Sequence, residues 1–224
     1  MNNSYYGNPR IDVLEFLSKK INDDINYKNI LDIGCASGEF CLNLKETYKI
    51  KNLNWTGIEK VKDLPNSKYN YANLGRCIHD DLPDCLDQLE NNYFDCIFAL
   101  DVLEHLIKPE NVLEKLKSKI KENGYLIISI PNISHFSIIL SLIKQNWIYK
   151  ESGILDKTHL RFFTPSSFKS FSNKQGWDVL HTYPINSYLG KKKFIFNFIM
   201  RLFPKYIINF FTFQHIYKLS YSKK

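Results

Sequence analysis

Residues 153 to 164, GILDKTHLRFFT, place a histidine and an arginine two positions apart between apolar and aromatic neighbours. A histidine titrates near neutral pH and can take a proton from a hydroxyl, while the planar guanidinium of arginine binds phosphate or carboxylate through paired hydrogen bonds. If THLRFF (158–163) is extended, His159 and Arg161 lie on one face about 7 Å apart. We therefore predict that His159 is a general base and Arg161 an anion-binding group, with Asp156 and Thr158 as further substrate contacts.

The same segment has a structural alternative, in which Asp156 pairs with Arg161 and His159 hydrogen-bonds to the backbone. A second candidate base is His105 in DVLEHL, directly after a strongly apolar run. Its alternative is also structural, because Asp101 and Glu104 have the spacing of a helix capping box. His135, after another apolar run, is a weaker candidate for substrate binding.

The elements that would position these residues alternate between strands and helices. The predicted strands are NILDIGC (29–35), NWTGIE (54–59), GRCIHD (75–80), FDCIFAL (94–100) and YLIISIPN (125–132), and the clearest helices are EFCLNLKETYK (39–49) and PENVLEKLKSKIKENG (109–124). Strands that are apolar on both faces and separated by helices indicate a parallel sheet that is covered on both sides. The predicted fold class is α/β, doubly wound.

Ligands of such sheets bind at the carboxyl ends of the strands, so the first strand-to-helix turn is the first place to examine. Here the turn is GCASG, in which Gly34 and Gly38 allow a tight turn at a helix N-terminus. The dinucleotide pattern G-x-G-x-x-G requires glycine where this chain has Ala36 and Glu39, which disfavours a nicotinamide dehydrogenase. Glu59 ends the second strand, where an acid can accept hydrogen bonds from both ribose hydroxyls.

Five blocks in order, LDIGCASGEF, GIE, HDDL, YFDCIFALDVLEHL and GYLIISIPN, resemble the class I S-adenosylmethionine-dependent methyltransferases. The resemblance implies a mostly parallel, seven-stranded, Rossmann-like sheet with an antiparallel last strand from residues 211–223. It also implies one domain over 1–224, with a cofactor-binding half at 29–132 and an acceptor-binding half at 133–224. The implied cofactor is S-adenosyl-L-methionine.

The resemblance also assigns cofactor contacts residue by residue. It maps Asp32, Gly34 and Gly38 to the methionine moiety, Glu59 to the ribose, and Asp81 with Leu82 to the adenine. Ala36, at the usual middle glycine of the turn, and Leu100, at the end of the fourth apolar run, complete the expected site.

The second half narrows the resemblance to a bacterial subgroup that is associated with surface-polysaccharide and other glycan biosynthesis. The matching blocks are GILDKTHLRFFTPSSF, GWDV and a basic aromatic stretch that ends in FQHIY. The subgroup implies an O-methyltransferase acting on a sugar, sugar phosphate or nucleotide-linked sugar, and therefore an anionic small-molecule acceptor. The alternatives are another small molecule, such as a phenolic quinone precursor, and a non-catalytic, membrane-associated subunit that keeps the fold.

Composition sets the remaining expectations. The 224 residues are 44% hydrophobic, enough for one sizeable core, and carry a net charge of +7. The five cysteines show no CxxC pairing, so we expect no disulfide framework, no zinc knuckle and a reducing, cytoplasmic location. No cluster of metal ligands stands out in the sequence, so we expect no metal. The insertion at 133–152 is predicted to be a helical lid over the acceptor pocket or a plain packing helix.

Positive charge is concentrated in the last part of the sequence. From residue 157 onward there are twelve Lys and Arg residues and one acidic residue. Residues 191–211, KKKFIFNFIMRLFPKYIINFF, interleave these cations with apolar and aromatic side chains. This pattern suits a membrane interface better than a nucleic-acid groove. We expect either peripheral membrane contact through 191–211 or an amphipathic helix packed on the domain, and no nucleic-acid partner.

Overall fold

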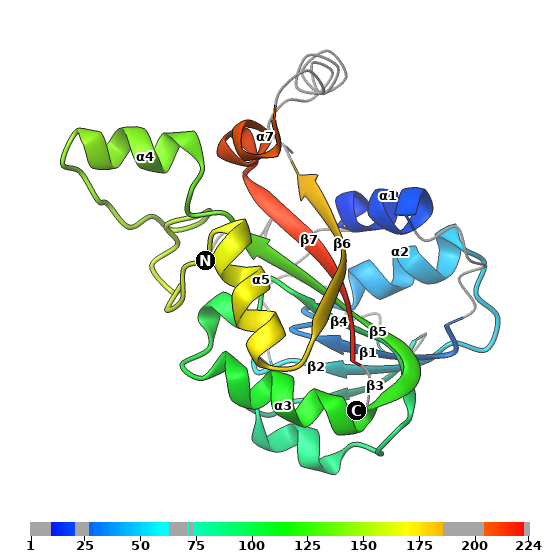
Figure 1. The fold of residues 1–224 in the computed structure, drawn as a ribbon. Helices are drawn as coiled ribbons and strands as arrows, with labels where there is room; N and C mark the ends of the chain where they lie inside the picture. The colour runs from blue at the N-terminus through cyan, green and yellow to red at the C-terminus, as the bar shows by residue number, and fades with distance from the viewer. Residues whose placement is uncertain (1–9, 21–26, 63–70, 72–73, 186–203, 222–224) are drawn as a thin grey trace.

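The computed structural model describes residues 10–20, 27–62, 71, 74–185 and 204–221 and contains one seven-stranded sheet (Figure 1). The strands are β1 (Asn29–Ile33), β2 (Asn54–Ile58), β3 (Gly75–Ile78), β4 (Phe94–Leu100), β5 (Ile120–Pro131), β6 (Asp178–Ile185) and β7 (Gln214–Ser220). Their order is β3-β2-β1-β4-β5-β7-β6, with β1 to β5 parallel and β7 antiparallel to both of its neighbours. The predicted Rossmann-like sheet and the antiparallel last strand within 211–223 are confirmed.

Helices cover both faces of the sheet. The helices of the described residues are α1 (Ile11–Lys20), α2 (Glu39–Thr47), α3 (Pro109–Lys119), α4 (Phe136–Ile143), α5 (Pro165–Lys174) and α7 (Lys205–Phe211), with 3-10 turns η2 (Asp84–Gln88) and η3 (Leu103–His105). Successive strand residues point to opposite faces, so Ile127 joins the core under α1 and α2 while Ile128 joins the core under α3 and α5. This alternation explains why the central strands are apolar throughout.

The helix predicted over 109–124 ends earlier, at Lys119. Ile120 is extended and buried, and it pairs with Phe94 of β4, so burial in the sheet takes this residue out of the helix. Gly124 lies inside β5 instead of ending the helix, and a Cβ there would stand 3.0 Å from the Phe94 carbonyl oxygen. The glycine is therefore needed for close approach of two backbones.

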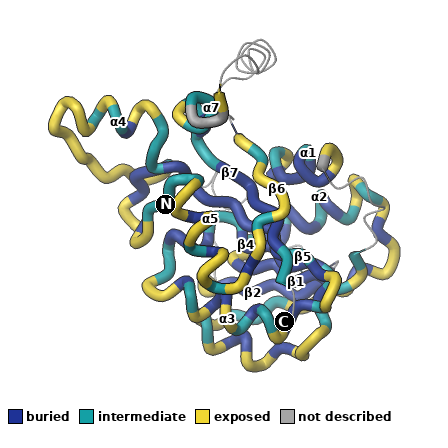
Figure 2. The backbone as a smooth tube through the Cα atoms, viewed as in Figure 1, coloured by how far each residue is buried: buried dark blue, intermediate teal, exposed yellow. Residues whose placement is uncertain are grey.

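The segment after β5 leaves the body of the domain. Helix α4 extends outward, and much of it and of the following loop is exposed (Figures 1 and 2). Of the helix only Ile138 is buried, in a small cluster with Ile154 and Leu155. Most of the basic segment 191–211 lies outside the described residues, which include its end as Pro204 and α7. In the described part of the chain, each helix is too short or too polar to cross a lipid bilayer.

Candidate active site

A cavity of about 880 Å³ opens at the carboxyl ends of β1, β2 and β4. The predicted cofactor residues that border it are Asp32, Gly34, Ala36, Glu59 and Leu100. The parallel strands β1 and β4 lie side by side in the sheet, so the residues that follow them meet at one edge, as expected for this fold class.

The turn after β1 shapes one wall of the cavity. Gly34, Ala36 and Gly38 all have positive φ angles, of 70°, 47° and 79°. A Cβ on Gly34 would lie 2.8 Å from a methyl carbon of Val102, so glycine is required there for both conformation and space. Gly38 precedes α2 and does not border the cavity, so its contribution is to the turn.

Glu59 fixes this turn from the end of β2. Its Oε2 accepts a hydrogen bond of 3.0 Å from the backbone N–H of Ala36, and its Oε1 accepts one of 3.0 Å from that of Val61. Each carboxylate oxygen keeps a second lone-pair direction, and the residue borders the cavity. The side chain thus fits a ligand that donates two hydroxyl hydrogen bonds, as a ribose does.

Asp32 is 3% exposed, and its Oδ2 has no hydrogen-bond partner among the described residues. Burial is the main reason that the pKa of this carboxyl rises to about 7, and the negative charge of Glu59 raises it further. A buried, unpaired carboxylate oxygen beside a cavity fits a cationic partner, such as the amino group of a bound methionine moiety.

The residues expected at the adenine are not brought to the cavity. Asp81 is exposed and pairs with Lys60 at 3.0 Å, while Leu82 packs against the core under α3 and α5. Neither residue borders the cavity, although Lys60 does. Their predicted contact with the cofactor therefore stays a proposal.

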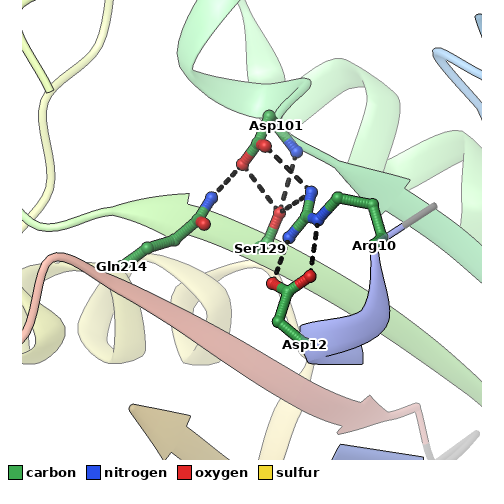
Figure 3. A network of polar contacts seen from close by, with 5 residues as sticks. All are labelled: Arg10, Asp12, Asp101, Ser129 and Gln214. Atoms are coloured by element: carbon green, nitrogen blue, oxygen red, sulfur yellow. Dashed lines mark hydrogen bonds and ion pairs between the residues drawn. The ribbon is translucent and has the colours of Figure 1, made fainter. Parts of the chain in front are cut away.

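A polar network lies near the end of β4 (Figure 3), and two of its members, Arg10 and Asp101, border the cavity. Arg10 donates to Asp101 at 2.9 Å and to Ser129 at 3.3 Å, and it pairs with Asp12 at 3.0 Å. Ser129 and Gln214 both donate to Oδ1 of Asp101. These residues come from α1 and its start, β5 and β7, and sequence reasoning missed them because no local pattern links them.

The predicted capping box at Asp101 and Glu104 is wrong. Asp101 uses its carboxylate in the network with Arg10, and η3 begins after Val102 without a side-chain cap. Asp101 itself has a φ of 57°, an uncommon value for a residue other than glycine. The turn after β4 is therefore held by tertiary contacts and not by a helix cap.

The two candidate bases lie together, with ring centroids 4.7 Å apart. His105 borders the cavity, and its Nδ1 lies 3.3 Å from the Thr158 carbonyl oxygen and 3.1 Å from the Thr158 hydroxyl. His159 is 8% exposed and does not border the cavity, and its Nδ1 lies 3.0 Å from the Ile154 carbonyl oxygen. Burial lowers the pKa of His159, which favours its neutral form.

The expectation that THLRFF (158–163) is extended, with His159 and Arg161 on one face, is wrong. Residues 159–162 form neither a strand nor a turn, and the backbone N–H groups of Leu160 and Arg161 both donate to the Glu104 carbonyl oxygen, at 2.7 and 3.0 Å. This anchor leaves His159 buried and Arg161 exposed. The Arg161 guanidinium donates to the carbonyl oxygen of Ile107 and does not border the cavity.

The alternative pairing of Asp156 with Arg161 is also wrong. Asp156 accepts hydrogen bonds from the Thr158 backbone at 2.8 Å and from the Thr158 hydroxyl at 2.6 Å. Asp156 and Thr158 both border the cavity, as predicted for substrate contacts. Their role there remains a proposal.

Two further predictions concern the insertion after β5. His135 caps the N-terminus of α4 by accepting from the backbone N–H of Ser137, and it does not border the cavity. Within 133–152 only Glu151 and Ser152 border the cavity, so in this arrangement α4 does not act as the predicted lid. The helix extends outward because only Ile138 among its side chains is buried.

Comparison with known proteins agrees with this geometry. A family model described as "Methyltransferase domain" matches residues 5–182. A ubiquinone biosynthesis O-methyltransferase of Rickettsia bellii (strain OSU 85-389) is 27% identical over 139 residues, which are 60% of this chain and 56% of that protein. The Rickettsia canadensis (strain McKiel) protein of the same name is 25% identical over 170 residues, or 74% of this chain and 70% of that protein. The chain thus spans little more than half of the first of these relatives.

Solved structures show the same fold. A SAM-dependent methyltransferase from Archaeoglobus fulgidus superposes with a TM-score of 0.63 at 20% identity, covering 97% of this chain and 96% of that one. A magnesium protoporphyrin IX methyltransferase from Synechocystis PCC 6803 with bound SAH has a TM-score of 0.60 at 15% identity, covering 95% and 81%.

The names of these proteins give no support to the predicted glycan subgroup. They do agree with the predicted cofactor, S-adenosylmethionine. The chain belongs to the methyltransferase-domain family, and its fold is that of the S-adenosylmethionine-dependent methyltransferases.

Proposed function

We propose that this protein is an S-adenosylmethionine-dependent O-methyltransferase that acts on a hydroxyl of a small molecule. One observation carries the proposal. The groups suited to the cofactor, Asp32 and Glu59, and a histidine suited to the acceptor, His105, border the same cavity. A volume of about 880 Å³ is within the usual range for small-molecule sites.

The bound cofactor would supply a methyl group that is already activated by a positively charged sulfur. The protein has to align the acceptor oxygen with that group and keep water out, which can supply much of the rate acceleration. The hydroxyl proton needs an acceptor. His105 donates from Nδ1 to the Thr158 carbonyl oxygen, so its Nε2 carries the lone pair that can take this proton.

The charges that border the cavity favour a neutral acceptor over an anionic one. Among the described residues, three lysine or arginine side chains border the cavity and each is paired: Arg10 with Asp101, Lys60 with Asp81, and Lys157 with Glu151 at 2.7 Å. Arg161, predicted to clamp an anion, lies outside the cavity lining.

Two neutral acceptor classes follow from this argument. A phenol is the first, supported by relatives named for ubiquinone biosynthesis. A sugar hydroxyl is the second, supported by the resemblance of most of residues 147–220 to the glycan subgroup. A sugar phosphate or nucleotide-linked sugar, which the subgroup also implies, ranks after these two.

The test is a panel of matched acceptors incubated with the full chain and S-adenosylmethionine. The panel contains a dihydroxybenzene, a neutral hexose and the phosphate of the same hexose, with methylated products identified by mass spectrometry. We expect product from the phenol. Product from the hexose phosphate alone would overturn the neutral-acceptor argument, and a folded protein that binds no S-adenosylhomocysteine would overturn the enzyme assignment in favour of the non-catalytic alternative.

We also propose that the apolar surface of α4 and its following loop contacts a membrane. The exposed apolar side chains there are Phe136, Leu140, Leu142, Ile143, Trp147, Ile148 and Tyr149. Contiguous exposed apolar surface with aromatic residues and nearby lysines, here Lys144 and Lys150, is typical of an interfacial contact. This surface adds to the contact predicted for 191–211, of which the described residues include only the end.

Co-sedimentation with anionic vesicles tests the membrane proposal. We expect the protein to pellet at low salt and less at high salt, because salt screens the lysine contribution. Ile143→Ser should reduce pelleting, whereas Leu180→Ser, an exposed leucine on β6, should not. Equal pelleting of both variants would exclude the α4 surface as the contact, and no pelleting of the wild type even at low salt would favour the alternative in which 191–211 is a helix packed on the domain.

A further inference from the structure

Three side chains with metal-binding atoms meet behind the cavity. Glu104 and His105 belong to η3, and His159 belongs to the turn segment that is anchored on the Glu104 carbonyl. One carboxylate oxygen and one nitrogen of each imidazole all lie within 4.8 Å of one another. The expectation of no metal rested on sequence spacing, which does not bring His159 to the other two.

Glu104 is a buried acidic residue whose carboxylate makes no hydrogen bond to the described residues. It is 1% exposed, and neither carboxylate oxygen has a hydrogen-bond partner among the described residues. Its burial, and next the negative charge of Asp101, raise the pKa of this carboxyl well above its usual range. Leaving both oxygens of a buried carboxyl without a partner is costly, and a bound cation would contact them and stabilise the charged form.

Both histidines are oriented as metal ligands usually are. The Nδ1 of His159 donates to the Ile154 carbonyl oxygen at 3.0 Å, and that of His105 donates to the Thr158 carbonyl oxygen at 3.3 Å. Each hydrogen bond fixes the ring and leaves Nε2 with the lone pair. Such backbone partners behind a ligating histidine are the rule in protein metal sites.

We propose that Glu104, His105 and His159 bind one divalent transition-metal ion. Two imidazoles and a carboxylate match zinc, which takes three protein ligands in sites that keep one position open. Ligands of a tetrahedral zinc are about 3.4 Å apart, so the cluster has to contract by roughly an ångström. The open position would face the cavity, because His105 borders it.

The site does not depend on the proposed function. It has one consequence for that function, since the Nε2 of His105 cannot both bind a metal and take a proton. A hydroxyl bound to the ion would instead lose its proton more easily, because the cation stabilises the anion.

Metal binding is measured on the full chain without cofactor or acceptor. The protein is freed of metal, titrated with zinc by calorimetry, and titrated with cobalt(II), whose visible absorption reports the coordination. We expect one equivalent of zinc and a tetrahedral cobalt spectrum without thiolate charge-transfer bands. Glu104→Gln and His105→Asn should each weaken zinc binding at least about 10-fold.

His105 is only half-buried, so its variant keeps the test valid if Glu104→Gln fails to fold. His181→Asn, which removes an exposed histidine of β6, is the matched control and should bind zinc as the wild type does. No zinc binding by the wild type, equal binding by all variants, or cobalt–thiolate bands would overturn the proposal. Methyl transfer by protein shown to be metal-free would leave the proposed function standing without this site contributing to it.

Discussion

The strands β1 to β5 and the segment between β5 and β6 differ in how their residues are held. Every central strand is buried on both faces, as the dark blue core of Figure 2 shows. In contrast, α4 contributes one buried residue, and 153–164 forms turns that are fixed by hydrogen bonds to η3. The first region forms the cofactor wall of the cavity, and the second supplies His159 and the contacts that orient His105.

The two sides of the site are therefore held by different kinds of interaction. The cofactor wall depends on close packing of a sheet, where small changes in volume are costly. The other side of the cavity, formed by η3 and residues 153–164 and called here the acceptor wall, depends on a few polar contacts. Such contacts can differ between related chains without disturbing the sheet. Related chains can therefore differ in the acceptor that they bind while keeping the same cofactor site.

The largest effect is expected at the acceptor wall. His105→Ala should lower kcat by about 100-fold to 10,000-fold, whether the residue is a base or a metal ligand, and leave S-adenosylhomocysteine binding unchanged. Steady-state kinetics measures kcat, and calorimetry measures the affinity for S-adenosylhomocysteine. His159→Ala tests the base prediction for the buried neighbour, and normal turnover would assign it a structural role.

Arg161→Lys is a companion change in the same segment. Because Arg161 donates to the Ile107 carbonyl outside the cavity, we expect KM for the acceptor to stay nearly constant. A large rise in KM for an anionic acceptor alone would restore the predicted anion clamp.

Two isoleucine variants test the packing difference directly. Ile128→Ala, at a fully buried position of β5, should lower the free energy of unfolding by about 2 to 5 kcal/mol. Ile143→Ala, at a position of α4 that is 72% exposed, should change it by less than about 0.5 kcal/mol. Denaturant unfolding measures the free energy of unfolding of both variants. A similar decrease for the two variants would show that α4 is packed in solution.

The raised pKa of Asp32 predicts a pH dependence of stability in the cofactor wall. Its pKa rises from 3.8 to about 7 on folding, so between these values the unfolded chain binds fewer protons and stability falls as pH rises. The full shift corresponds to at most about 4 kcal/mol. Asp32→Asn should flatten the unfolding free energy over about pH 4 to 7, and an unchanged slope would rule out Asp32 as its source.

Glu59→Ala should weaken S-adenosylmethionine binding by about 1.5 to 3 kcal/mol, the range for hydrogen bonds to charged groups. Glu59 also holds the backbone N–H groups of Ala36 and Val61, so Glu59→Gln serves as the control that keeps the shape of the side chain. Calorimetry on folded variants gives the difference, and an unchanged dissociation constant would remove Glu59 from the site.

The smallest effect is expected from Ala36→Gly. Ala36 has a φ of 47°, which is strained for a residue with a Cβ and free for glycine. Glycine relieves this strain but has more conformational entropy in the unfolded chain, which offsets part of the gain. We expect a net increase of about 0.5 kcal/mol in the free energy of unfolding. A loss of stability in thermal unfolding would show that the Cβ makes a favourable contact.

The sequence by itself determined the sheet, its antiparallel last strand and the position of the cofactor wall. The parallel sheet and the glycine turn follow from local patterns, since a strand buried on both faces has to be apolar throughout, and a tight turn needs residues that tolerate positive φ. The antiparallel last strand and the cofactor assignments of Asp32, Ala36 and Leu100 came from the resemblance to the methyltransferases, and all three residues border the cavity.

Only the tertiary structure decided the acceptor wall. The backbone N–H groups of residues 160 and 161 both donate to the Glu104 carbonyl oxygen in a segment that is not a strand, with His159 buried and Arg161 exposed. Arg10, Ser129 and Gln214 reach Asp101 from segments far apart in the chain. Such contacts leave no periodic signal, because each depends on where the folded sheet brings a backbone or side-chain group and not on its neighbours in sequence.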